Sequence, residues 1–98
     1  MGLKTVTTCL GYQQITPDTS TALTVPATDP AGNKLQPTMA VLVPEGQTVR
    51  WRDDGTAPTA SVGMPLAAGV TLQYDGDLSK IKFIEQTASA KLNISYYV

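Results

Sequence analysis

Two adjacent aspartates, Asp53 and Asp54, are the residues of this chain that come closest to a catalytic pair. Neighbouring residues of a strand point to opposite faces, so the two carboxylates converge only where a turn bends the chain. Gly55 and Thr56 follow directly and favour such a turn. Glycoside hydrolysis would need a second, separated acid, and the chain has only eight acidic residues. We therefore expect both aspartates to accept hydrogen bonds from turn amides.

The residue types do not favour metal binding, nucleophilic catalysis or nucleotide binding. The run Asp75-Gly76-Asp77 matches a fragment of a calcium loop, which needs six or more oxygen ligands and ends in a glutamate. The chain has no histidine, so zinc clusters and histidine-activated nucleophiles are excluded. No phosphate-binding or dinucleotide-binding glycine pattern is present. The sequence predicts a protein that is not an enzyme and that holds no cofactor or metal.

The single cysteine, Cys9, cannot form a disulfide within the chain. Its neighbours Val6 and Leu10 are apolar, and free cysteine is among the most often buried residue types. A catalytic thiol would need a base, which the absence of histidine removes. We expect Cys9 to be a small buried apolar residue.

Arg50 and Arg52 flank Trp51 in a segment that alternates cleanly. Alternation places Val49 and Trp51 on one face, which is expected to face the core, and the two arginines on the other. The arginines can pair with the neighbouring aspartates, meet an acidic partner, or form a solvated polar face.

Four tyrosines complete the set of candidate contact residues. Tyr96 and Tyr97 point to opposite faces of the last predicted strand, so one is expected in the core and Tyr97 in contact with solvent or a partner. With Tyr12 and Tyr74 they could form a sugar-stacking surface, although their spacing is not specific for one. The candidate interface consists of Arg50, Arg52 and Tyr97.

The elements that must position these residues are short strands. Apolar and polar residues alternate or cluster in segments separated by glycine and proline: 3–10, 13–15, 21–25, 39–43, 47–52, 70–74, 80–83 and 91–97. No window shows the three-to-four spacing of a helix, and a single helical turn is possible only at 86–90. The pattern predicts one all-β domain over residues 1–98, a small antiparallel β-sandwich or jelly-roll-like barrel.

Three connections are distinctive. Residues 39–43 and 47–52 are expected to form a hairpin around Glu45-Gly46. Residues 26–37 hold three prolines and form a long loop, of the kind that is either functional or mobile. The chain after Trp51 is expected to be a structural loop that crosses to a strand at Val70. The residues that shape it are Trp51, Asp53, Asp54, Gly55, Pro58, Gly63 and Pro65.

Composition narrows the partners and the cellular location. The net charge is −1, and the chain has no basic block, so nucleic-acid binding is not expected. No apolar run is long enough to span a membrane, and the N-terminal residues lack the pattern of a secretion signal. A domain of 98 residues buries only about two-thirds of its unfolded surface, so contacts between copies would add stability. We expect synthesis in the cytoplasm without export.

Residues 49–97 resemble a family of small proteins encoded in tailed-phage genomes. The resembling segments are VRWRDDGTAPTASVGMPLAAG, LQYDG, IKFIE and LNISYY, while the first 45 residues carry no such likeness. The resemblance implies a structural virion component, most specifically a capsid decoration (cement) protein on the capsid surface. Its implied partners are the major capsid protein and further copies of itself, as a dimer or trimer. The alternatives are a carbohydrate-binding β-sandwich and a small tail or host-recognition component.

Overall fold

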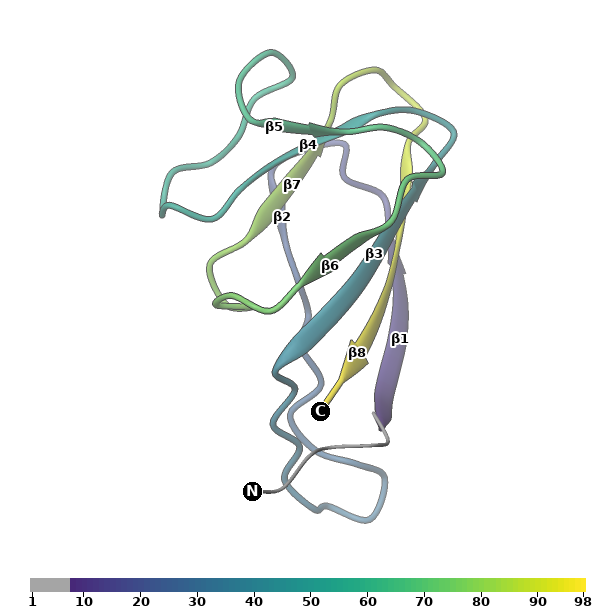
Figure 1. Ribbon diagram of the computed structural model, residues 1–98, viewed down its shortest axis with the longest axis vertical. Coiled ribbons are helices and arrows are strands. Elements are labelled where there is room, and N and C mark those ends of the chain that lie inside the picture. Colours follow the sequence, from purple (N-terminus) through teal and green to yellow (C-terminus); the bar gives the residue numbers. More distant parts are fainter. Residues whose placement is uncertain (1–7) are drawn as a thin grey trace.

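The computed structural model describes residues 8–98 (Figure 1). Eight strands form two four-stranded antiparallel sheets that pack as a sandwich, as predicted. The first sheet contains, in spatial order, β1 (Cys9–Ile15), β8 (Lys91–Tyr97), β3 (Met39–Glu45) and β6 (Leu72–Tyr74). The second contains β2 (Thr21–Ala22), β7 (Lys82–Glu85), β4 (Val49–Arg52) and β5 (Met64–Leu66). The predicted strand at 3–10 lies mostly outside the described residues.

The strand order is that of a jelly roll. Each connection between consecutive strands crosses from one sheet to the other, except the connection from β4 to β5. This order, β1-β8-β3-β6 facing β2-β7-β4-β5, corresponds to the two interlocked Greek keys of that architecture. Residues 8–98 contain no helix, so the helical turn considered at 86–90 does not form. No helix in this part of the chain is therefore long and apolar enough to cross a membrane.

The core lies between the two sheets and follows from period-two alternation. In β8 every second residue is almost completely buried, ending at Tyr96, while the residues between them face outward. Phe83 in β7 and Val49 in β4 bury their side chains from the second sheet. Tyr96 is therefore the core tyrosine of the last pair, as expected, and Tyr97 lies on the outer face.

The hairpin predicted from residues 39–52 is wrong. β3 pairs with β8 and β6, whereas β4 pairs with β7 and β5, so the turn around Gly46 carries the chain across the sandwich. The register explains the preference, because β8 matches all seven residues of β3 from Met39 to Glu45. β4 has only four residues that could pair with β3. Longer pairing satisfies more backbone groups, and the crossing lets both strands bury an apolar face.

Gly46 allows this crossing. It has a φ of +85°, and a Cβ added there would lie 2.9 Å from the carbonyl oxygen of Ser89. We expect Gly46→Ala to lower the free energy of unfolding by about 2–4 kcal/mol, through the left-handed backbone and the clash. Gly32→Ala is the matched control, because Gly32 has a φ of +86° with no atom within 4 Å. Urea unfolding measures both, and an equal loss of stability would show that the Ser89 contact is unimportant.

Cys9 is exposed, which corrects the expectation of a buried thiol. The pairing of β1 with β8 shifts by one residue between Cys9 and Gly11. This bulge leaves Leu10 packed against the core and places Cys9 opposite the outward-facing Tyr97. A bulge reverses the side-chain alternation locally, and apolar neighbours alone do not predict it.

The proline-rich loop at 26–37 folds back on itself. An isolated bridge joins Thr28 and Lys34. Between them the carboxylate of Asp29 accepts hydrogen bonds from two backbone amides and from the side chain of Asn33. The hydrogen bond from the Asn33 side chain is the main cause that lowers the pKa of Asp29 below its usual value. The loop thus has a defined turn at its tip.

Candidate functional site

The three residues of the candidate interface do not lie together. Arg50 and Arg52 are on β4 in the second sheet, and Tyr97 is on β8 in the first. Each alternates with core-facing neighbours, so the two arginines project from the outer face of the second sheet and Tyr97 from the outer face of the first. A flat partner cannot contact all three at once.

Arg50 serves the fold of its own chain. Its Nη1 donates to the backbone carbonyl of Gly63 at 2.9 Å, and its Nε donates to Oε1 of Gln86 at 3.1 Å. The first bond ties β4 to the end of the loop that leads into β5. The guanidinium is therefore engaged on both sides and is not a free contact for an acidic partner.

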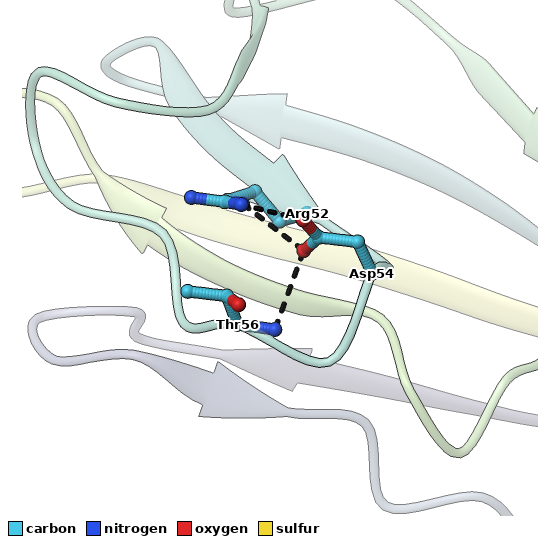
Figure 2. A network of polar contacts seen from close by, with 3 residues as sticks. All are labelled: Arg52, Asp54 and Thr56. Atoms are coloured by element: carbon cyan, nitrogen blue, oxygen red, sulfur yellow. Dashed lines mark hydrogen bonds and ion pairs between the residues drawn. The ribbon is translucent and has the colours of Figure 1, made fainter.

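Arg52 and Asp54 form an ion pair at the loop that leaves β4 (Figure 2). The Arg52 Nη2 lies 2.5 Å from Asp54 Oδ2, and its Nε donates to Oδ1 at 3.1 Å. The amide of Thr56 also donates to Asp54 Oδ1, at 3.3 Å. The hydrogen bond from Arg52 is the main cause that lowers the pKa of Asp54, and the same bond raises the pKa of Arg52. Asp54 thus holds the turn that begins at Gly55.

Asp53 has a different partner from Asp54. Its Oδ2 accepts a hydrogen bond of 2.7 Å from the hydroxyl of Tyr74, which belongs to β6 in the opposite sheet. The ring of Tyr74 meets Trp51 edge to face, with centroids 6.1 Å apart. Burial, and then the bond to Asp53, raise the pKa of Tyr74 to about 12. The two adjacent aspartates are therefore engaged separately, and one of them links the two sheets.

The loop after Trp51 contains a strand that sequence patterns did not predict. Pro58 is buried, and the turn from Thr59 to Val62 returns the chain to the edge of the second sheet as β5. Gly63 has a φ of +146°, and a Cβ there would lie 3.2 Å from the side chain of Pro58. A strand with Pro65 at its centre is atypical, because proline has no N–H to donate to a neighbouring strand. For this reason the sequence pattern did not predict β5.

The predicted strand at 70–74 begins later than expected. β6 starts at Leu72, and Val70 lies before it with half of its side chain exposed. Gly69 donates to the carbonyl of Pro44, and Val70 donates to the carbonyl of Ala67, so a turn occupies this segment. The predicted segment at 70–74 is therefore too long by two residues at its start.

An open groove of about 490 Å³ lies where β4 ends and β5 begins. Trp51 lines it from the core side, residues 52–54 form one border, and residues 62–64 form the other. Val62 is 51% exposed and Met64 is 57% exposed, so the lining is largely apolar and open to solvent. Sequence reasoning missed these two residues. Their signal was an alternating apolar pattern at 62, 64 and 66, masked by Pro65 within it.

A second cavity, of about 460 Å³, borders residues 75–79. Here Asp77 Oδ1 accepts bonds from the amide of Ser79 at 2.9 Å and from its hydroxyl at 2.5 Å. These bonds are the main cause that lowers the pKa of Asp77. The part of the chain that the structure describes holds no group of three metal-ligating side chains. Asp75-Gly76-Asp77 forms a bend, and a hydrogen-bonded turn from Asp77 to Lys80 follows it.

Gly76 gives a direct test of the Tyr74 contact. A Cβ at Gly76 would lie 2.4 Å from the hydroxyl oxygen of Tyr74, whose ring is held by Trp51 and Asp53. We expect Gly76→Ala to displace the ring and lower the free energy of unfolding by about 1–3 kcal/mol. Gly11→Ala is the control, because its Cβ would make only an ordinary contact of 3.5 Å with Pro26. Thermal unfolding compares the two, and equal midpoints would contradict a fixed Tyr74.

The tyrosines do not make a single stacking surface. Tyr74 and Tyr96 are buried in the core, whereas Tyr12 is exposed and Tyr97 half-buried on the outer face of the first sheet. The hydroxyl of Tyr12 donates to the side-chain oxygen of Asn93 at 2.5 Å. The aromatic ring that borders a groove is Trp51.

Comparisons of this chain with protein-family models, with curated proteins and with solved structures found no match. The arrangement around Trp51 offers apolar contact, one ion pair and one hydrogen-bonded carboxylate. Such a set suits recognition and binding.

Proposed function

We propose that this chain is a non-enzymatic structural component of a phage virion, most specifically a capsid decoration (cement) protein. In this role it binds the lattice of the major capsid protein, stabilises the head, and associates with copies of itself as a dimer or trimer. The observation that carries the proposal is the resemblance of residues 49–97 to small proteins encoded in tailed-phage genomes.

The fold is compatible with this role. Jelly rolls occur in viral capsid domains, although they occur in lectins as well, so the architecture alone does not select one function. More informative is where the resembling residues lie. The segment 49–69 builds β4, β5 and the groove beside Trp51, which is the apolar recess of the second sheet.

The acidic pair supports a binding role over a hydrolytic one. Asp54 is held by Arg52, and Asp53 is held by Tyr74 across the sandwich. Paired catalysis by two carboxylates needs both groups to face one substrate with different protonation states. Both aspartates instead hold local structure together.

Mass spectrometry of purified virions tests the proposal. We expect this chain in the particle, at a copy number that is a simple multiple of the capsid lattice. Separated heads and tails then locate it, and recovery with the heads is expected. Its absence from purified virions would overturn the proposal, and recovery with tails alone would replace decoration by the tail alternative.

A carbohydrate-binding function is the second candidate, because one observation favours it. Trp51 lines an open groove that Asp53 and Asp54 also border, and ligand sites combine aromatic walls with a few placed polar groups. A glycan array with the wild-type protein and Asp53→Asn tests this alternative. Glycan binding that depends on Asp53 would support it, and an array without hits would remove it.

A further inference from the structure

The groove beside Trp51 leaves apolar side chains uncovered at one place in the fold. Val62 and Met64 are each more than half exposed and border the same recess. Exposed apolar surface with a polar rim marks interaction sites, and methionine adapts its shape to different partners. The volume of about 490 Å³ is also within the usual range of binding pockets, about 300–1,000 Å³.

The charged side chains that border the groove are Arg52, Asp53 and Asp54. Within residues 8–98 the ion pair of Arg52 with Asp54 is the only one, so these two charges compensate each other. Asp53 receives only the neutral hydroxyl of Tyr74. The groove therefore presents one uncompensated negative charge beside an apolar recess. Its electrostatic complement is a cation next to an apolar group.

The backbone of β5 limits how a partner can bind. β5 is an edge strand of the second sheet, and such edges can accept an additional strand. Pro65 stands at its centre opposite Arg50 and has no N–H to donate. A partner strand would lose the central hydrogen bond of a three-residue edge, so recognition must come from side chains in the groove.

We propose that this groove is a docking site for a segment of a partner protein that presents an apolar side chain beside a lysine or arginine. The segment's chemistry follows from the groove, and only its identification as part of the major capsid protein rests on the proposed function. A sugar fits less well. Asp54 is occupied by Arg52, so Asp53 is the one carboxylate of the groove left to accept bonds from the several hydroxyls of a sugar.

Amide NMR spectroscopy of the whole chain tests the site with two capped tetrapeptides and with maltotriose. One peptide has leucine next to lysine and the other has leucine next to glutamate. The first is expected to shift the amides of residues 51–54 and 62–64 and to bind about twofold to fivefold more tightly than the second. Asp53→Asn should remove this preference, and Asp18→Asn, at an exposed turn aspartate, should keep it.

Two valines provide a matched pair for the apolar part. Val62 is 51% exposed in the groove, and Val70 is 50% exposed outside it. Val62→Thr is expected to weaken the lysine peptide about threefold, and Val70→Thr to leave it unchanged. Equal affinity for both peptides, shifts outside the groove, or groove shifts with maltotriose alone would each overturn the inference.

Co-sedimentation with empty capsids separates the failure of this inference from that of the proposed function. Wild-type protein that does not sediment with capsids would overturn the proposed decoration function. The peptide titrations would still test the groove as a docking site. Wild-type, Asp53→Asn and Val62→Thr proteins that sediment equally would leave decoration standing and overturn the groove as its contact. Reduced sedimentation of both variants, with Val70→Thr unaffected, is the expected result.

Discussion

Replacing Phe83 by alanine is expected to lower the free energy of unfolding by about 3–5 kcal/mol. Phe83 is completely buried on β7, between Thr21 of β2 and Trp51 of β4, and faces the core. Removing its ring leaves a cavity that the rigid strands on either side cannot close. Since a small domain is stable by only about 5–15 kcal/mol, this loss is a large part of the total.

Urea unfolding followed by tryptophan fluorescence measures the effect, because Trp51 is the neighbour of Phe83 across the strands. Ile84→Ala is the control on the same strand. Ile84 alternates with Phe83 and is only half-buried on the outer face, so its replacement should cost about 1 kcal/mol or less. A Phe83→Ala protein as stable as the Ile84→Ala protein would contradict the observed core.

Stability should fall steeply between about pH 10 and pH 12. Burial is the main cause that raises the pKa of both Tyr74 and Tyr96 from 10.0 to about 12. Between these values the unfolded chain loses the two protons and the folded protein keeps them. The contribution of the two buried phenols to the free energy of unfolding is therefore fully present below pH 10. It falls as the pH rises and levels off above the folded-state pKa. Two such groups give a slope of up to about 2.7 kcal/mol per pH unit.

Urea midpoints measured at intervals across this pH range test the prediction. Tyr96→Phe removes one of the two buried phenols and should reduce the slope to about half. The exposed Tyr12 gives the control, because Tyr12→Phe should leave the slope unchanged. A flat profile between pH 10 and pH 12 in the wild-type protein would show that the two hydroxyls are not buried in solution.

The sequence predicted which residues face the core more reliably than which strands are neighbours. Alternation in residues 91–97 identified the buried face of β8 correctly, because a sheet with one covered face imposes period two. The same pattern does not specify pairing. Residues 39–43 and 47–52 therefore looked like a hairpin, whereas the seven-residue match with β8 determines where β3 lies. A bulge, invisible in composition, moved Cys9 outward.

In the candidate site too, local contacts could be predicted from the sequence and contacts between distant strands could not. The local bond of Asp54 to Thr56 follows from turn chemistry within three residues and was predictable. The bond from Tyr74 to Asp53 joins two sheets across 21 positions of the chain, so it depends on topology. The groove was missed for the same reason, because Val62 and Met64 border Trp51 only after β5 has paired with β4.

The central place of β8 has a consequence for the timing of synthesis. Of the eight strands described, β8 is synthesised last, yet it lies between β1 and β3 and pairs with both. Until residue 97 has emerged, the first sheet lacks the strand that joins its halves, and the apolar sides of β1 and β3 have no partner between them. The chain must therefore be synthesised through β8 before the first sheet can form. Its many pairings between distant segments also place it among slower-folding topologies.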